Sequence, residues 1–215
     1  MSNSYFSLLP NFQYINPNRV GGRKKQYVEV KNLFLRMKIR DSVFFNATNF
    51  RKYNIEDGQR PDNVSQVLYG DPNFDWVVLL TANIINVRDE WPLSSRLLYD
   101  VMYDKYQENL NATRQYETKE IRDSNGRLLM PGGQVVDQSF RINDPENPGQ
   151  LVNPTVAVSN WLVEVRKNNK KRTINVLRKQ YLTSFVNEAR DLLQYQESSQ
   201  FSTKLRQKIA FENKN

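Results

Sequence analysis

The spacing of apolar residues changes between two and about 3.6 along the chain, and each period predicts a different kind of element. In residues 33–40, LFLRMKIR, the apolar residues Leu33, Leu35, Met37 and Ile39 alternate with mostly basic residues. A period of two is typical of a strand that buries one face. We therefore expect a strand over this segment.

Residues 50–88 are predicted to form a strand, two helices and a return strand. Tyr53 and Ile55 alternate in the first strand, which ends at the turn sequence EDG. A helix starts at Pro61, because proline suits the first helical position. The return strand is expected around Ile84, Ile85 and Val87.

The two helices meet at the corner YGDP, residues 69–72. Gly70 stops the first helix, while Asp71 caps the second and Pro72 occupies its first position. The apolar stripes at helical spacing are Val64, Val67 and Leu68 in the first helix and Phe74, Val77, Val78 and Thr81 in the second. The second helix is apolar on most sides, so we expect it to be largely buried and to end near Asn83.

Beyond this unit the pattern predicts a helix at 94–107, a hairpin in IRDSNGRLLM around Asn125-Gly126, and a helix at 179–195. WLVEV and TINVL flank RKNNKKR, which indicates a second hairpin over 161–177 with a basic tip. In the tail, Phe201, Leu205 and Ile209 recur every four residues.

The predicted fold class is α+β, with a small core and additions on both sides. The expected parts are an extended N-terminal arm at 1–27, a core with a flanking strand and helix at 28–106, an irregular insert at 107–160, and a basic hairpin plus helix at 161–215. The insert is rich in Gly, Pro, Asn and Asp and is too long for a bare connection, so it is either an interface segment or disordered.

Composition removes most enzyme chemistries. The chain of 215 residues contains no His and no Cys, which excludes thiol nucleophiles, disulfides, thiolate metal sites and the commonest general base. Carboxylate pairs remain, but nothing places two of them on one rigid frame. We assign no catalytic, cofactor-binding or metal-binding residue. We expect no membrane span and no secretory signal, because no run of about 18 apolar residues exists and MSNSYFSLLP lacks a signal's charged and apolar regions.

The net charge of +8 is unevenly distributed. Residues 1–160 contain 19 Lys and Arg against 18 Asp and Glu, whereas residues 161–215 contain 12 against 5. Such an asymmetry fits a nucleic-acid contact, an acidic protein surface or a solvated face. A nucleic-acid contact is the weaker hypothesis, because the aromatic residues that alternate with cations in single-strand binders are missing.

Candidate functional residues fall into two groups. The first is expected to contact protein partners, through aromatic residues of the arm and basic residues of the hairpin tip: Tyr5, Phe6, Phe12, Tyr14, Arg166, Lys167, Lys170, Lys171 and Arg172. The second is expected to define the fold: Tyr69, Gly70, Asp71, Pro72, Trp76 and Trp91.

Residues 53–83 resemble the LysM module, which typically runs from Y-x-I/V-x-x-G-D through an apolar helix and a Y-G corner to a second helix ending near Asn. This chain has RPDN at 60–63 where many LysM modules have Asp-Thr-Leu, and it contains a single copy.

The wider pattern is similar to the gene product fifty-three family of T-even-type contractile phages. It comprises YFSLLPNFQY, VKNLFLR, Y-x-I-x-x-G-x-R-P, YGDPNFDWVVLL, EWPLS and NNKKRTINVL, over residues 5 to about 190. The resemblance implies a virion protein, made and assembled in the host cytoplasm, that clamps baseplate wedges. Its implied partners are other wedge subunits and the inner baseplate and sheath-initiating proteins, and it brings no cofactor.

Three alternatives remain open: a LysM-type binder of peptidoglycan, a nucleic-acid-binding protein that uses the basic C-terminal region, and, more distantly, an enzyme.

Overall fold

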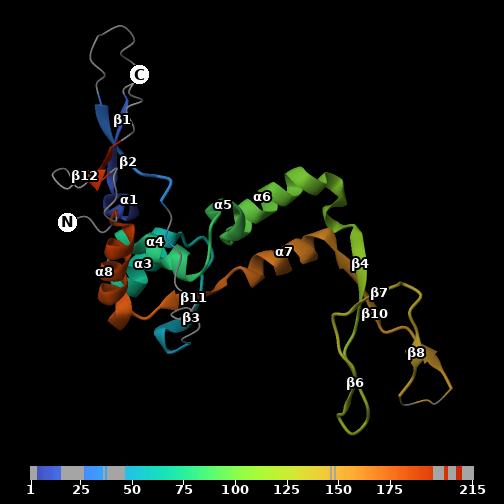
Figure 1. Cartoon of the computed structure of the whole chain (residues 1–215). Helices are drawn as coiled ribbons and strands as arrows, with labels where there is room; N and C mark the ends of the chain where they lie inside the picture. The colour runs from blue at the N-terminus through green and yellow to red at the C-terminus, as the bar shows by residue number, and fades with distance from the viewer. Residues whose placement is uncertain are drawn as a thin grey trace. The chain divides into compact units, whose positions relative to one another are not determined.

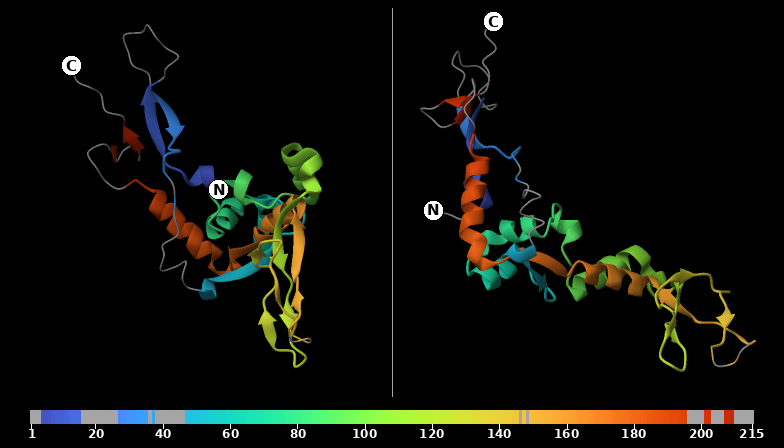
Figure 2. Two further views of the ribbon diagram at one scale, coloured as in Figure 1. Left: turned by 90° about the vertical axis from the view of Figure 1, so that its right-hand side faces the viewer. Right: turned by 60° about the horizontal axis from the view of Figure 1, so that its bottom comes forward.

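The computed structural model describes residues 4–15, 27–35, 37, 47–145, 147, 149–195, 201–202 and 207–209 (Figures 1 and 2). The chain divides into two compact units. The first unit comprises 1–55, 59–91 and 173–215, and the second comprises 56–58 and 92–172. Helices and strands are mixed in both, so the α+β class is confirmed.

The core of the first unit combines two helices with a two-stranded antiparallel sheet. Its elements are β3 (Phe50–Asn54), α3 (Pro61–Tyr69), the 3-10 turn η2 (Pro72–Phe74), α4 (Asp75–Thr81) and β11 (Thr173–Leu177). β3 pairs with β11 from Asn54 opposite Thr173 to Phe50 opposite Leu177. The strand partner of β3 therefore comes from more than 90 residues beyond α4.

The corner between the two helices follows the sequence prediction. Pro61 occupies the start of α3, and Gly70 ends the helix with φ +83°, a left-handed conformation that favours glycine. Asp71 accepts a hydrogen bond at 2.9 Å from the backbone N–H of Asn73, so its side chain caps the turn that leads into α4. The predicted helices at 61–69 and 75–81 are confirmed, and Asn83 has φ +57° just beyond α4.

Large side chains from both helices and both strands fill this core. Val64, Val77 and Val176 are fully buried. Tyr69 is buried as well, and its hydroxyl donates to the backbone oxygen of Leu177 at 3.0 Å, which ties α3 to β11. Val67 was expected in the apolar stripe of α3 but is exposed, because Ser65 and Tyr69 occupy the inward positions beside Val64 and Leu68.

Trp76 and Trp91 both lie in the core of the first unit. The Trp76 ring stacks on Phe185 with centroids 6.0 Å apart and contacts Tyr5 at the same distance. The indole N–H of Trp91 donates to the backbone oxygen of Gln59 at 2.8 Å. Both tryptophans therefore fill volume, and Trp91 also satisfies its polar group.

The predicted helix at 179–195 is confirmed as η4 (Lys179–Tyr181) followed by α8 (Leu182–Leu193), which packs on the core of the first unit (Figure 1). Leu182, Val186, Ala189 and Leu193 form its buried stripe. Their spacing is that of one helix face.

The predicted return strand at 84–87 is wrong. Residues 87–90 form the short helix α5 (Val87–Glu90) instead. The Asn86 side chain accepts from the Arg88 N–H, and the Glu90 carboxylate accepts from the Ile85 N–H at 2.7 Å. These local hydrogen bonds favour a helix start over strand pairing.

The N-terminal segment is more regular than an extended arm. Residues 5–8 form α1 (Tyr5–Leu8), and β1 (Asn11–Ile15) lies between β2 (Tyr27–Lys31) and β13 (Gln207–Ile209) in a sheet that β12 (Phe201–Ser202) completes. The prediction of an arm without helix or sheet is therefore wrong for these residues, because pairing along β1 satisfies its backbone. Residues 16–26 lie outside the described part.

The strand predicted at 33–40 is not formed by the described residues of that segment, 33–35 and 37. Residues 33–34 form a turn and residues 35 and 37 are irregular. Leu35 and Met37 still face the core as the alternation predicted, whereas Leu33 is exposed. Residues 36 and 38–40 lie outside the described part.

The predicted helical spacing in the tail is not found in its described residues. Residues 201–202 and 207–209 form the strands β12 and β13, and Leu205 lies outside the described part.

The second unit contains two helices and a small sheet. The helices are α6 (Ser95–Tyr106), continued by η3 (Gln107–Asn111), and α7 (Asn160–Lys170). The sheet has the order β10-β4-β7, from β10 (Thr155–Ser159), β4 (Thr113–Thr118) and β7 (Val135–Val136). Two hairpins extend from it: β5 (Ile121–Arg122) with β6 (Leu128–Met130), and β8 (Ile142–Asn143) with β9 (Leu151–Val152).

Two predictions for this unit are confirmed and two are wrong. The helix at 94–107 and the hairpin in IRDSNGRLLM both form. The insert at 107–160 is not irregular, since it supplies the whole sheet. The basic hairpin at 161–177 does not exist, because residues 160–170 form α7.

The start of α7 explains why the hairpin prediction failed. The Ser159 side chain accepts from the Leu162 N–H and caps the helix. Positions 161, 164, 165 and 168, which have helical spacing, are the less exposed face, but Glu and Asn occupy two of them. Only TINVL becomes a strand, and it pairs with β3 of the first unit.

Within the described residues, no helix is both long and apolar enough to cross a lipid bilayer.

Candidate protein-interaction surfaces

The described residues contain no group of three or more carboxylates that could hold a metal ion. Their unusual features are exposed apolar surfaces and charged side chains arranged around buried carboxylates. Three such apolar surfaces can be defined, each inside one unit.

The first surface is the α6 face, which we define as Tyr99 and Tyr103 of α6 together with Trp161 of α7; Leu97 and Val101 are also exposed but lie on the other side of α6. Tyr99 and Tyr103 are each about half exposed, at 50% and 52%. Their rings stack with centroids 6.1 Å apart, and Tyr99 meets Trp161 edge-on at 5.9 Å. Rigid, partly exposed Tyr and Trp side chains are the residues that most often anchor protein interfaces.

The buried side of α6 is small by comparison. Only Leu98, Met102 and Leu110 form the buried cluster here, with partly buried residues such as Tyr106 and Val165 around it. Apolar residues therefore flank the buried ridge of α6 on both sides. A helix with such a wide apolar band is normally covered by more protein than α7 alone.

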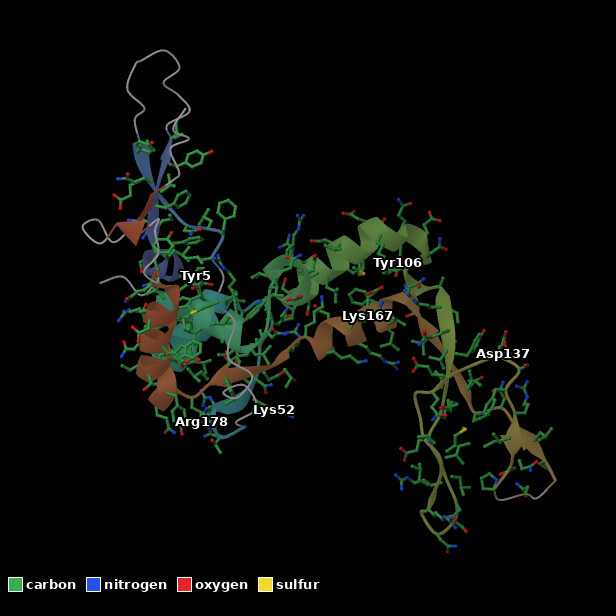
Figure 3. The ribbon with its side chains drawn as sticks, in the orientation of Figure 1. Tyr5, Lys52, Tyr106, Asp137, Lys167 and Arg178 are labelled. Carbon is green, nitrogen blue, oxygen red and sulfur yellow. The ribbon has the colours of Figure 1, made fainter. Side chains whose placement is uncertain are left out.

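A buried carboxylate organises the charge between α6 and α7. Glu164 is 10% exposed, and its Oε1 accepts from the Tyr106 hydroxyl at 2.8 Å. The same oxygen lies 3.3 Å from Lys105 Nζ, 3.4 Å from an Arg114 guanidinium nitrogen and 3.4 Å from Lys167 Nζ. Figure 3 labels Tyr106 and Lys167 on these two helices.

The pKa values of this cluster follow from its geometry. Burial raises the pKa of Glu164, but hydrogen bonds from Tyr106 and Lys105 lower it by more than burial raises it. The pKa of Glu164 therefore lies below its usual value. The pKa of Lys105 is raised by its interactions with Tyr106 and Glu164. The carboxylate is thus held in its charged form and ties three cations to one point.

Two further ion pairs use basic residues that were expected at a hairpin tip. A guanidinium nitrogen of Arg166 lies 2.6 Å from Glu117 of β4, and this hydrogen bond lowers the pKa of the Glu117 carboxyl. Arg172 lies 2.6 Å from Asp57, whose pKa it lowers in the same way.

The five basic candidates therefore lie on α7 and the turn after it. Arg166, Lys167 and Arg172 are engaged in pairs within the second unit. Lys170 is exposed in the last turn of α7, and Lys171 follows at its C-terminus. Contact of these residues with a partner stays a prediction.

The second surface is the β1–β2 face, which we define as Phe12, Tyr14, Val28 and Val30. Phe12 lies opposite Val30, and Tyr14 lies opposite Val28, so all four side chains share one side of the sheet. The Phe12 and Tyr14 rings meet edge-on at 6.2 Å, and Tyr14 is 54% exposed.

The other two aromatic candidates separate into different environments. Tyr5 packs on Trp76, and its hydroxyl donates to the Leu35 oxygen at 3.5 Å, so it belongs to the core of the first unit. Phe6 is 61% exposed and remains available. Partner contact by Tyr5 could therefore use only the exposed part of its ring.

The third surface is an apolar groove of about 350 Å³ in the first unit. Its walls come from α1, α4, the turn after β2 and the segment before α5: Tyr5, Leu33, Leu35, Met37, Trp76, Leu79, Leu80, Ile84 and Ile85. Beside it, Phe34 is 91% exposed.

Sequence reasoning missed the α6 face and the groove. The signal for the first was present, because Tyr99 and Tyr103 are four residues apart in a segment correctly predicted as helix. The groove had no such signal, since its walls come from segments far apart in the sequence.

Comparison with known proteins gives one consistent result. Residues 5–128, more than half of the chain, match the family model described as base plate wedge protein 53. The chain is also 24% identical over 149 residues to baseplate wedge protein gp53 of Enterobacteria phage T4, covering 69% of this chain and 74% of that protein. The chain therefore belongs to the base plate wedge protein 53 family and is a structural protein of the phage tail baseplate.

Proposed function

We propose that this chain is a wedge subunit that clamps neighbouring wedge and inner baseplate proteins together during tail assembly in the host cytoplasm. The observation that carries the proposal is the α6 face, where two stacked, half-exposed tyrosines lie against a partly buried tryptophan, beside a buried cluster formed by Leu98, Met102 and Leu110. A surface of this kind gains stability when a second protein covers it.

The two units supply more than one such surface. The β1–β2 face and the groove belong to the first unit, and the α6 face belongs to the second. The exposed apolar residues therefore fall into separate surfaces on both units, whereas a stable protein interface is one continuous contact that buries about 1,200–2,000 Å² in total. We therefore propose that the chain contacts more than one neighbour, with sheath-initiating proteins among them.

The LysM-like interpretation of the first unit is part of this proposal. Its support is the order strand, helix, helix and strand in β3, α3, α4 and β11, with the two strands antiparallel. In this interpretation, the residues between α4 and β11 are an insertion that adds the second unit to a small core.

The test is reconstitution with the other wedge proteins of the same phage, followed by size-exclusion chromatography. The Tyr99→Ser, Tyr103→Ser double variant removes both stacked rings of the α6 face. Interface anchors of this type contribute about 2 kcal/mol or more, so the affinity for the wedge partner should fall by roughly thirtyfold or more.

A matched control replaces two isolated exposed apolar residues, Val67→Ser and Leu192→Ser, which lie on α3 and α8. This control should assemble like the original chain. Equal affinity of the tyrosine double variant and the original chain would reject the α6 face as an interface, and failure of the original chain to join any wedge protein would reject the clamp itself.

A further inference from the structure

Four cations lie at one end of the two-stranded sheet of the first unit. Arg51 and Lys52 belong to β3, and Arg178 and Lys179 follow directly after β11. All four are exposed, and none of them forms an ion pair with another described residue. We call these four residues the basic strip. In Figure 3, Lys52 and Arg178 are labelled beside the β3 and β11 ribbons.

The pairing of β3 with β11 holds the strip together. Arg51 lies opposite Val176, and Lys52 lies opposite Asn175. The Arg178 N–H donates to the Asn49 oxygen at 2.9 Å and so extends the pairing by one residue. Cations that are more than 120 positions apart in the sequence are thereby brought to the same end of one sheet, with Arg51 and Arg178 on one face of the pairing and Lys52 on the other.

One of the four is also fixed in orientation. The Arg178 Nε donates to the backbone oxygen of Phe50 at 3.2 Å, so this side chain is held against β3. A guanidinium held in place in advance loses less side-chain entropy when it binds a carboxylate.

The two sequence segments that carry the strip contain no acidic residue. Residues 47–55 and 173–187 contain no Asp and no Glu. The two units differ in the same sense: the residues of the first unit include 19 Lys and Arg against 11 Asp and Glu, whereas those of the second include 12 of each. The net charge of +8 therefore resides in the first unit, although the sequence had suggested a property of the C-terminal quarter.

We propose that the basic strip binds an acidic segment of another baseplate protein. This inference rests on the proposed function for its partner and on charge complementarity for the chemistry. Carboxylates are the natural counterpart of a strip that combines two arginines with two lysines, because guanidinium groups pair with them in a defined geometry.

The surroundings of the strip favour a protein over a nucleic acid. Single-stranded nucleic acids are bound by cations together with aromatic rings on which bases stack. Phe50 is buried, and the Tyr53 hydroxyl donates to Gln59 at 3.1 Å, so the aromatic residues of β3 are engaged in the fold. The exposed rings described in the first unit, Phe6, Tyr14 and Phe34, belong to other segments.

The test compares three proteins: the original chain, the Lys52→Glu, Lys179→Glu variant, and the matched control Lys119→Glu, Arg127→Glu. The control changes the net charge equally but at exposed residues of the second unit. Two labelled probes are titrated by fluorescence anisotropy at low salt: a twelve-residue oligoglutamate and a twelve-nucleotide single-stranded DNA. Each variant is also reconstituted with the wedge proteins of the phage.

The expected result is that the strip variant loses about tenfold or more of the oligoglutamate affinity and of the wedge affinity, while the control loses little. The difference should shrink at high salt, because the Debye length falls to about 3 Å at 1 M. Equal loss in both variants would show a non-specific charge effect and overturn the proposal.

Two other results would also overturn it. Tighter binding of the DNA than of the oligoglutamate through the same residues would assign the strip to nucleic acid. Unchanged wedge assembly by the strip variant would mean that these charges only protect an edge strand from unwanted pairing. If the original chain binds oligoglutamate through the strip but joins no wedge protein, the proposed function fails while the chemistry of the strip stands.

Discussion

Replacing Glu164 by glutamine should destabilise the second unit by about 2 kcal/mol at neutral pH. The glutamine keeps the shape of the side chain and an acceptor for the Tyr106 hydroxyl. It removes the charge that holds Lys105, Arg114 and Lys167 near one oxygen. The three cations then repel one another without compensation.

The magnitude follows from the exposure of the groups. Removing one partner of a fully buried ion pair costs about 3–5 kcal/mol. Here the carboxylate is 10% exposed, whereas the side chains of the three cations are 38–54% exposed and can turn toward water. Exposed pairs contribute about 0–1 kcal/mol each, so most of the expected cost comes from weakening the hydrogen bond of Tyr106 to a charged acceptor.

Hydrogen exchange measured by mass spectrometry can localise this loss of stability to the second unit. Peptides that cover α7 should lose protection by about thirtyfold in the variant, which corresponds to about 2 kcal/mol. Peptides from α3, in the first unit, serve as the internal control and should change little.

The pH dependence supplies the sharper check. The pKa of Glu164 in the folded chain lies below its ordinary value of 4.5, so its stabilising effect is complete above that value. The effect is lost as the pH falls through the folded-state pKa. The difference between the original chain and the variant should therefore be present at pH 7 and shrink below pH 4.5. Equal protection at pH 7, or a difference that persists undiminished in acid, would refute the role given to this carboxylate.

Three further substitutions test single contacts by urea unfolding. Tyr69→Phe should cost about 1 kcal/mol, because the buried Leu177 oxygen loses its donor, and an unchanged midpoint would contradict this. Gly70→Ala should cost about 1 kcal/mol through its φ of +83° alone, since no atom lies within 4 Å of an added Cβ, and Gly70→Asn should cost less. Asn168→Ala should cost about 2 kcal/mol, because the side chain makes two 2.8 Å hydrogen bonds to the backbone of Leu93.

The sequence predicted those elements whose signals are local. Pro61, Gly70 and Asp71 mark the ends of α3 and the start of η2, and each acts through its own backbone or a neighbour's N–H. The apolar stripe of α8 was likewise visible, because Leu182, Val186, Ala189 and Leu193 face one way in a single helix.

The wrong predictions, the hairpin at 161–177 and the return strand at 84–87, depend on contacts that the local sequence does not show. α7 places Glu164 and Asn168 on its inward face, where they are satisfied by Tyr106 and by the backbone of Leu93. A pattern read from apolar residues alone therefore saw no helix. The return strand failed because β3 pairs with β11 instead; Ile84 packs against the core without forming a strand, and Ile85 is exposed. Such a distant pairing is set by tertiary structure and leaves no local signal.

The environments of the candidate contact residues likewise depend on residues far away in the sequence. Of the arm aromatics expected to contact partners, Phe6 and Tyr14 are exposed, whereas Tyr5 packs on Trp76 in the core. The engagement of Arg166 with Glu117 and of Arg172 with Asp57 depends on partners that are 49 and 115 positions away. The basic strip was invisible for the same reason, because its two halves meet only through the β3–β11 pairing.

The most direct test of the account is a cryo-electron microscopy map of the assembled baseplate from the phage that encodes this chain. The account predicts that the chain is present in the wedge and that a neighbouring protein covers Tyr99 and Tyr103 on the α6 face. A baseplate that lacks the chain, or one in which both tyrosines remain open to solvent, would contradict the central claim.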